Sequence, residues 1–186
     1  MAGNTPRIYV WDIIVRLCHI IFIVGVINAF VTYQLGLMDW HMVNGYVVLG
    51  ALAVRIVWGF VGTPYARFRQ FLSGPRRALV YVLNWKNEPV PTGHNPLGGY
   101  AVLALLAFLS VQAVTGLFAD DEIMTTGPLN DTVSGETAKW LTNVHEYNFY
   151  WFLLPVIGMH ILAALVYLLV KRTNLIKPMI TGYKAD

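Results

Sequence analysis

Four long apolar runs dominate the pattern of hydrophobic and polar positions along this chain. They extend over about residues 13–33, 41–61, 97–118 and 140–170. A helix needs roughly 20 apolar residues to cross the hydrocarbon core of a bilayer, and each run is long enough. The runs are about twice as long as a barrel strand and do not alternate, so a membrane β-barrel is excluded. The pattern predicts an all-α membrane protein, a bundle of four transmembrane helices.

The composition agrees with a lipid-embedded chain. Of the 186 residues, 56% are hydrophobic and only 12% are charged, whereas about a quarter of the residues of a soluble domain are charged. We expect a single membrane domain over residues 1–186. The first apolar run is too long for the core of a signal peptide and no small-residue cleavage site follows it, so we interpret it as a retained span. The single cysteine, Cys18, allows no disulfide and is interpreted as a buried packing residue.

The charges of the loops predict the topology. The loop 62–96 carries five basic residues against Glu88 alone, and the tail from residue 171 is also basic. The loop 119–139 carries five acidic residues against Lys139 alone. Short basic loops stay in the cytoplasm. We therefore expect both termini and the loop 62–96 to be cytoplasmic, with the other two loops on the opposite side.

Four of the five histidines lie within or at the edge of the apolar runs: His19, His41, His145 and His160. Ionisable residues at membrane depth are costly and usually functional, although any one of them could simply hydrogen-bond a neighbouring helix. With the predicted topology and a rise of about 1.5 Å per residue, they fall at two depths. His19 and His160 share the cytoplasmic level, and His41 and His145 share the opposite level.

Two histidines at one depth on different helices of a bundle can bind one haem from both sides. A neutral imidazole is a good iron ligand, and the macrocycle fills apolar space between helices. Such a haem suits electron transfer rather than oxygen binding. Covalent haem attachment is excluded because the chain has no C-x-x-C-H motif. The zinc motif H-E-x-x-H is absent because Phe149 stands where its second histidine would be.

Two arginines are candidate partners of haem propionates. Arg16 lies three residues before His19, and Arg55 lies 14 residues after His41, near the cytoplasmic level. A carboxylate at membrane depth needs a cation, and the guanidinium fork matches it. For Arg16, the alternative is that its side chain reaches to the membrane interface.

The chain resembles the bacterial cytochrome b561 family, which includes the b-type cytochrome subunits of nickel-iron hydrogenases. The likeness covers nearly the whole chain and is carried by Trp11–His19, His41–Tyr46, Arg55–Gly62, Tyr65–Phe68, Gly93–Gly98, Thr115–Gly116, Val144–Glu146, His160 and Met179–Lys184. It implies a four-helix bundle in the bacterial cytoplasmic (inner) membrane with two haems b. It also implies the pairs His19/His160 and His41/His145, in agreement with the depth argument.

One spacing departs from that family. The two histidines of its last helix are usually 14 residues apart, whereas His145 and His160 are 15 apart. In an ideal helix one extra residue adds about 100° of rotation. Pro155 lies between the two histidines, and a one-residue π-bulge would absorb the extra residue. We predict a bulge or kink in the turns preceding Pro155.

The expected function is electron transfer between the membrane quinone pool and a redox partner on the periplasmic side. The acidic loop 119–139 would attract a basic partner such as a soluble c-type cytochrome, or it merely keeps the loop solvated. The resemblance also allows a hydrogenase or dehydrogenase partner, or superoxide. A homodimer and a subunit of a larger redox complex both fit the sequence. We expect no nucleic-acid partner, and the sequence does not choose between an electron carrier and an oxidoreductase subunit.

Two other functions remain compatible with the sequence. A membrane quinone oxidoreductase would need its own quinone site with a proton-carrying residue. His94 is the candidate, although a structural role in the loop before Pro96 is the favoured interpretation. A non-haem transporter or assembly subunit would need a polar path through the bundle. The third apolar run offers only Gln112 and a few hydroxyls for such a path.

Overall fold

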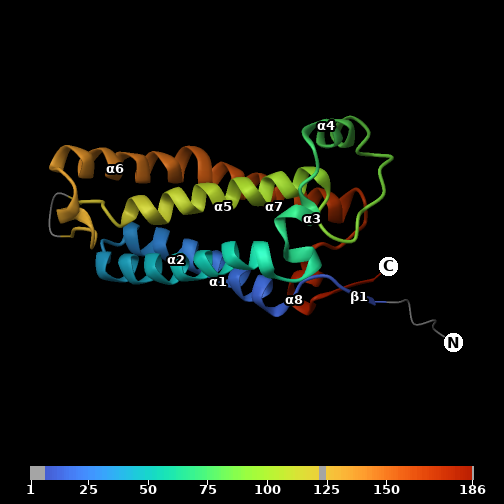
Figure 1. The fold of residues 1–186 in the computed structure, drawn as a ribbon, viewed down its shortest axis with the longest axis horizontal. Helices are drawn as coiled ribbons and strands as arrows, with labels where there is room; N and C mark the ends of the chain where they lie inside the picture. Colours follow the sequence, from blue (N-terminus) through green and yellow to red (C-terminus); the bar gives the residue numbers. More distant parts are fainter. Residues whose placement is uncertain (1–6, 122–124, 186) are drawn as a thin grey trace. The chain divides into compact units, whose positions relative to one another are not determined.

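The computed structural model describes residues 7–121 and 125–185, and most of them are helical (Figure 1). The chain divides into two compact units. The first unit comprises Met1–Leu17, Arg55–Leu103 and Gly158–Asp186, and the second comprises Cys18–Val54 and Ala104–Ile157. The chain therefore passes from one unit to the other four times along its length.

Four helical stretches of the described chain are long and apolar enough to span a membrane, as the apolar runs predict. They are α1 (Ile13–Gln34), α2 (Met38–Val61), α5 (Pro96–Gly116) and the continuous stretch Gly135–Leu169. The last consists of α6 (Gly135–Asn148), the π-helix η3 (Phe149–Leu153) and α7 (Leu154–Leu169). Many large hydrophobic side chains are exposed, as lipid-facing positions require. The fold is a multi-pass membrane helical bundle.

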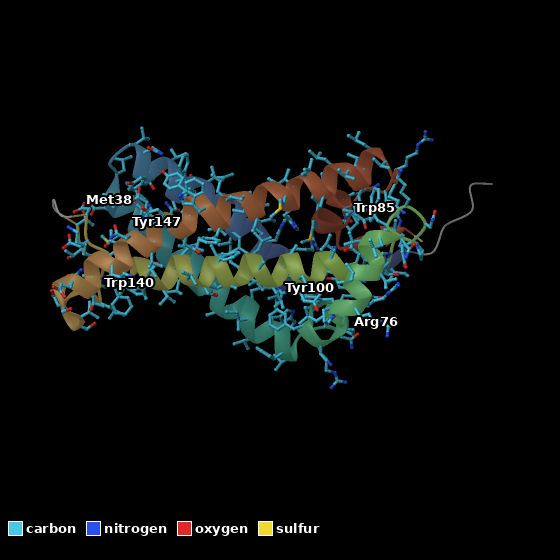
Figure 2. The ribbon with its side chains drawn as sticks, turned by 90° about the horizontal axis from the view of Figure 1, so that it is seen from above. Met38, Arg76, Trp85, Tyr100, Trp140 and Tyr147 are labelled. Carbon is cyan, nitrogen blue, oxygen red and sulfur yellow. The ribbon has the colours of Figure 1, made fainter. Side chains whose placement is uncertain are left out.

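The helix ends follow from local sequence. Gly36, with φ +69°, occupies the left-handed region in the turn between α1 and α2. Ser134 caps α6 by accepting a hydrogen bond from the Thr137 N–H, and Asn95 Oδ1 accepts from the Gly98 N–H at the start of α5. In α6, the exposed Trp140 and Tyr147 (Figure 2) provide the amphipathic rings that are common near membrane interfaces.

In the second unit, α1 and α2 pack closely through small residues. A Cβ added at Gly25 would lie 2.4 Å from a methyl carbon of Val48, so the two helices approach there at the distance that only glycine allows. Cys18 is buried, and its thiol contacts the Ala51 carbonyl oxygen at 3.5 Å. The expected packing role of Cys18 is confirmed.

The first unit joins the two ends of the chain. Strand β1 (Arg7–Tyr9) pairs antiparallel with β2 (Tyr183–Ala185). Gly182, with φ +86°, lets its carbonyl oxygen accept hydrogen bonds from the Val10 and Trp11 N–H groups. The remaining short elements of this unit are η1 (Pro64–Ala66), α3 (Phe68–Phe71), α4 (Pro75–Leu83) and α8 (Ile176–Thr181); η2 (Asn130–Thr132) belongs to the second unit.

A buried carboxylate fastens the start of α1 to the end of α2 in the first unit. Asp12 accepts a hydrogen bond from the Val15 N–H at 3.0 Å, and its other oxygen accepts from Trp58 Nε1 at 2.9 Å and from the Thr63 hydroxyl. Burial raises the pKa of Asp12, but these hydrogen bonds outweigh burial and lower the pKa below its usual 3.8. Asp12 is therefore an ionised structural residue at neutral pH.

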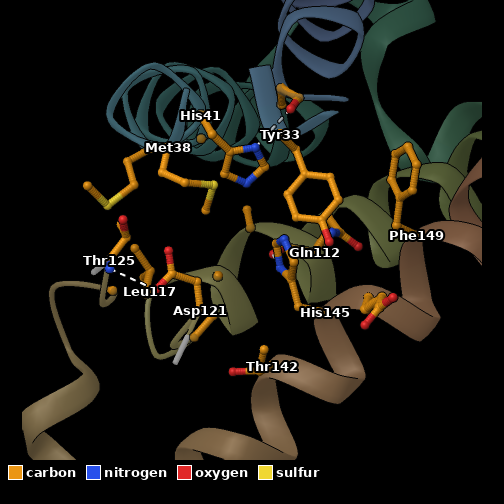
Figure 3. A pocket seen from close by; sticks show the side chains of 18 of the residues that line it. Tyr33, Met38, His41, Gln112, Leu117, Asp121, Thr125, Thr142, His145 and Phe149 are labelled. Carbon is orange, nitrogen blue, oxygen red and sulfur yellow. Dashed lines mark hydrogen bonds between the residues drawn. The ribbon is translucent and has the colours of Figure 1, made fainter. Parts of the chain in front are cut away.

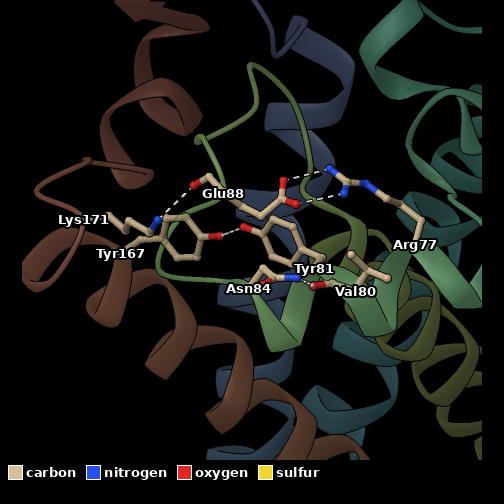
Figure 4. A network of polar contacts seen from close by, with 7 residues as sticks. All are labelled: Arg77, Val80, Tyr81, Asn84, Glu88, Tyr167 and Lys171. Atoms are coloured by element: carbon tan, nitrogen blue, oxygen red, sulfur yellow. Dashed lines mark hydrogen bonds and ion pairs between the residues drawn. The ribbon is translucent and has the colours of Figure 1, made fainter.

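The loop after α4 is fastened to the end of α7 by a polar network (Figure 4). The Tyr167 hydroxyl accepts from Asn95 Nδ2 at 2.8 Å and from Trp85 Nε1 at 3.3 Å, and it shares a hydrogen bond with the Tyr81 hydroxyl. Lys171 Nζ donates to the Glu88 carbonyl at 2.9 Å. Burial and the bond to Tyr167 raise the pKa of Tyr81, so its hydroxyl stays protonated at neutral pH.

Candidate functional site

A large pocket of about 1340 Å³ lies within the second unit and is lined by α1, α2, α5, α6 and η3. Ligand pockets usually measure about 300–1,000 Å³, so this pocket has room for a large cofactor. His41 of α2 and His145 of α6 face each other in it (Figure 3). Their ring centres are 6.2 Å apart, with 75° between the ring planes. The structure thus brings the imidazoles of His41 and His145, a predicted pair, close together across a pocket.

Each of these imidazoles is held at one nitrogen by a backbone carbonyl. His41 Nδ1 lies 2.8 Å from the Ala29 oxygen, and His145 Nδ1 lies 2.8 Å from the Gln112 oxygen. A carbonyl oxygen only accepts hydrogen bonds, so we assign the ring hydrogen to Nδ1 in both residues. The Nε2 lone pair is then available to a metal. Metal-binding histidines generally have this arrangement, in which the second nitrogen donates to a carbonyl or carboxylate.

The spacing of the rings fits one metal ion between them. A metal–imidazole bond measures about 2.0–2.1 Å and the centre of the ring lies about 1.1 Å beyond the nitrogen, which gives ring centres about 6.3 Å apart for two imidazoles on opposite sides of one metal. The observed separation is 6.2 Å. His41 and His145 are therefore close enough together to hold one metal, such as a haem iron, between them.

Two glycines shape this pocket. A Cβ added at Gly116 would lie 2.9 Å from His145 Cε1, so the imidazole takes its position because Gly116 has no side chain. Gly45 lines the pocket one turn after His41, and a Cβ added there would meet nothing within 4 Å. Gly45 therefore leaves open space beside His41, which suits a flat macrocycle.

The helix that carries His145 is irregular where the sequence predicts it. The π-helix η3 extends over Phe149–Leu153 and ends two residues before Pro155. Proline lacks the N–H that the helix would use, and a π-turn accommodates one extra residue in the stretch before it. The prediction of a bulge or kink before Pro155 is confirmed.

The remaining histidines of the two predicted pairs belong to different units. His19 lies on α1 in the second unit and His160 lies on α7 in the first unit, and both side chains are half-buried. Their pairing stays a prediction from the sequence.

The two predicted propionate arginines lie in the first unit and differ in surroundings. Arg55 is buried, stacks over the Phe68 ring at 5.4 Å, and points Nη2 toward the Ala66 oxygen at 3.4 Å. Arg16 donates from Nε to the Met179 oxygen at 3.3 Å and from Nη2 to the Ile180 oxygen. Arg16 therefore holds the carbonyl end of α8, a role that its sequence position did not reveal.

His94 lies in the first unit between two aromatic rings. Its ring centre is 4.7 Å from that of Trp11 and 4.6 Å from that of Phe71. Its Nδ1 is buried and has no hydrogen-bond partner among the described residues. Burial lowers the pKa of His94 to about 4, with further lowering by the charges of Arg55 and His160. His94 is therefore neutral at pH 7, which favours the structural interpretation.

The acidic loop contributes to the lining of the pocket of the second unit. Asp120 and Asp121 line it together with Lys139 and Thr142. The Asp120 N–H is bonded to the Thr142 hydroxyl at 3.0 Å, which connects the loop to α6. Glu122 lies outside the described residues.

Sequence reasoning missed the groups that hold His145 in place. The acceptors of its Nδ1 hydrogen are the Gln112 carbonyl and the Thr115 hydroxyl, at 2.8 and 3.2 Å. Asn148 is buried and bonds to the Gln112 side chain at 2.7 Å. A backbone acceptor has no sequence signature, but the amides of Gln112 and Asn148 within apolar stretches were a visible signal.

Comparison with known proteins places the chain in a family. The family model described as prokaryotic cytochrome b561 matches residues 10–182. A "Probable Ni/Fe-hydrogenase B-type cytochrome subunit" of Azotobacter chroococcum mcd 1 is 26% identical over 211 residues, covering 95% of this chain and 88% of the relative. Proteins of the same name from Bradyrhizobium diazoefficiens and Azotobacter vinelandii are 26% and 25% identical, with 97% and 95% of this chain and 87% and 88% of the relatives covered. No solved structure matches the chain. The chain therefore belongs to the prokaryotic cytochrome b561 family and is a membrane cytochrome b with an electron-transfer role.

Proposed function

We propose that this cytochrome transfers electrons between the membrane quinone pool and a redox partner on the periplasmic side through two haems b. His41 and His145 would hold one haem and His19 and His160 the other. The observation that carries the proposal is the His41–His145 pair, with ring centres 6.2 Å apart and both Nδ1 atoms bonded to carbonyls. When bound, haem supplies a one-electron iron couple whose potential depends on its axial ligands and surroundings.

The chain's own contribution is to hold His41 and His145 in fixed orientations, so that both imidazoles would bind the haem iron. The Ala29 and Gln112 carbonyls fix the tautomers, so neither Nε2 carries a hydrogen. With two protein ligands, the iron would have no free position for oxygen or substrate. This arrangement therefore favours electron transfer over chemistry at the metal.

The π-helix supports the second pair. A one-residue π-bulge adds a residue without advancing the helical register, so the 15-residue spacing of His145 and His160 acts as a spacing of 14. Fourteen residues are close to four turns, which keeps both imidazoles on one helix face. Arg55, a buried cation, is proposed to bind a propionate of the haem at His160. Arg16, already bonded to two α8 carbonyls, is proposed as a second propionate contact.

The redox partner is proposed to dock at the acidic loop on the periplasmic side. Asp120 and Asp121 line the pocket that would hold the haem of His41 and His145. A basic soluble protein such as a c-type cytochrome would be attracted to this side. The relatives are named as hydrogenase cytochrome subunits, so membership of a larger complex with a hydrogenase is the second candidate arrangement.

A quinone site of the protein's own is proposed near His94 as the alternative function. The buried Nδ1 without a described partner could accept a hydrogen bond from a quinol hydroxyl. The low pKa makes His94 a poor proton acceptor at neutral pH. Quinol oxidation rates in His94→Gln test this role, since a structural residue would leave the quinol KM unchanged.

Proteoliposomes test the proposed function. The purified protein is reconstituted with a quinol in the bilayer and a soluble c-type cytochrome outside. We expect reduction of the external cytochrome that depends on the protein and is lost in His145→Ala. The same rate in His145→Ala, with the variant inserted and folded, would contradict the proposal.

A further inference from the structure

We propose that the buried amide pair Gln112–Asn148 is a positioning device that fixes the imidazole of His145 and thereby sets the reduction potential of the haem it binds. This inference rests on the proposed haem site of His41 and His145. It assigns a role to two residues that are not themselves candidate haem ligands.

Asn148 holds α5 at two points one turn apart. Its side chain is only 5% exposed, and Nδ2 donates to Gln112 Oε1 at 2.7 Å and to the Phe108 carbonyl oxygen at 2.9 Å. Both Nδ2 hydrogens therefore have partners on the same helix. A buried amide without partners costs about 1–3 kcal/mol, and such bonds are stronger in apolar surroundings.

Gln112 of α5 also holds His145 in place. The Gln112 carbonyl accepts from His145 Nδ1 at 2.8 Å, and the Thr115 hydroxyl lies 3.2 Å from the same nitrogen. Thr115 donates its own hydrogen to the Val111 carbonyl at 2.7 Å, so its oxygen can accept from His145. His145 and Asn148 are three residues apart and thus lie on one face of α6. Gln112 of α5 is therefore bonded to both residues. Its backbone carbonyl bonds to His145, the candidate haem ligand, and its side chain bonds to Asn148.

The location explains why such a device is useful. Asn148 is the last residue of α6, and the π-helix η3 begins at the next position. A π-turn interrupts the regular hydrogen-bond ladder, so the helix is less firmly held about its axis there. A rotation of α6 would swing His145 Nδ1 away from the Gln112 carbonyl. The amide pair opposes this rotation at the point where the irregularity begins.

The amide pair would affect the reduction potential of the haem through the imidazole of His145. A hydrogen bond from Nδ1 to a carbonyl raises the basicity of Nε2, which stabilises oxidised iron. Loss of the amide pair would loosen that bond and raise the potential of this haem. It would also change the angle between the two imidazole planes, 75° in this structure, on which the low-spin EPR signal depends.

The test uses Gln112→Leu and Asn148→Leu in the purified full-length protein, with Gln112→Met as a variant that keeps the side-chain volume. Haem content, the potentials of both haems and the EPR spectrum are measured. We expect unchanged haem content and a rise of one potential by a tenfold change in its reduction equilibrium, about 59 mV for one electron. The EPR signal of that haem should shift while the other haem stays unchanged. The exchanged pair Gln112→Asn with Asn148→Gln should restore both readouts.

Ser110→Ala is the matched control. Ser110 lies on α5 between Phe108 and Gln112, but its hydroxyl bonds within its own helix, to the Leu106 oxygen at 2.7 Å. We expect no change of potential. If Gln112→Met and Asn148→Leu keep both haems at unshifted potentials, or if Ser110→Ala shifts them equally, the positioning role is wrong. Wild-type protein without haem, or a His145→Ala variant with two low-spin haems, would instead overturn the proposed haem site.

Discussion

The central residues of the candidate site are two imidazoles, each held at one ring nitrogen by a hydrogen bond. His41 and His145 each bond a carbonyl of a neighbouring helix through Nδ1, and this bond fixes the tautomer and the ring direction. The sequence predicted that these two residues form a pair. It did not predict the acceptors, because a carbonyl is present at every residue. The close approach at Gly116 was likewise visible only as a glycine in an apolar run.

Gly116→Ala tests the close approach at His145. The added Cβ would lie 2.9 Å from His145 Cε1 and 3.2 Å from Nδ1, so the imidazole must move. We expect a weaker or shifted low-spin signal from one haem and an unchanged signal from the other, measured by optical and EPR spectroscopy. Gly50→Ala is the control, because a Cβ there meets nothing within 4 Å and Gly50 does not line the pocket. An unchanged spectrum in Gly116→Ala would show that the described position of His145 is wrong.

Asp12→Asn tests the buried carboxylate. The amide group would face the Trp58 and Thr63 donors, so the free energy of unfolding should fall by about 1–3 kcal/mol. Because the folded pKa of Asp12 is lowered, its stabilisation is present above its ordinary pKa of 3.8 and is lost as the pH falls through the lower folded value.

Thermal unfolding in detergent, from neutral pH to below 3.8, measures both effects of Asp12→Asn. The wild type should lose stability in acid more steeply than Asp12→Asn. The exposed Asp131 provides the control Asp131→Asn, for which no change is expected. Equal acid sensitivity of wild type and Asp12→Asn would contradict the assignment.

At the scale of elements, the spans were predictable and their ends were less so. The apolar runs located all four spans because burial in lipid requires continuous apolar sequence. The second helix begins at Met38 and the fourth stretch at Gly135, three and five residues before the predicted starts. Polar residues such as Asp39 and Glu136 occupy those first turns, where the helix no longer needs apolar side chains. The π-helix was predictable because the histidine spacing and Pro155 both pointed to it.

Changing the length of the π-helix tests whether it sets the rotational position of His160 relative to His145. Deleting Tyr150 should convert η3 to regular α-helix and shorten the spacing of His145 and His160 to 14, so both imidazoles should stay on one face and both haems should be retained. Inserting one alanine after Trp151 should instead rotate His160 by about 100° and remove one haem. Haem content per chain measures both. Loss of a haem in the deletion variant and not in the insertion variant would contradict the register argument.

At the scale of the whole molecule, family membership and composition agree on a multi-pass membrane cytochrome b. The topology with both termini in the cytoplasm stays a prediction from the loop charges. The contacts of the two chain ends, through β1 and β2, could not be predicted, because three-residue strands carry no usable pattern. The role of Arg16 at α8 could not be predicted either, because it depends on where the tail folds back.

Salt dependence tests the proposed docking of a basic partner at the acidic loop. The rate of electron exchange with a basic soluble c-type cytochrome should fall as ionic strength rises, because salt screens charges more than about 10 Å apart at 0.1 M. Replacing Asp131 and Glu136 by Asn and Gln should lower the rate at low salt and flatten its salt dependence. Stopped-flow kinetics measure both. The same slope in wild type and variant would show that the acidic loop only solvates this side.

Haem stoichiometry tests the central claim most directly. The protein is purified in mild detergent, and haem per chain is measured as the pyridine haemochromogen together with the low-spin spectrum. The account predicts two low-spin haems b in the wild type and in His94→Gln. It predicts one in each of His19→Ala, His41→Ala, His145→Ala and His160→Ala. Two low-spin haems in His145→Ala or His41→Ala, or none in the wild type, would contradict it.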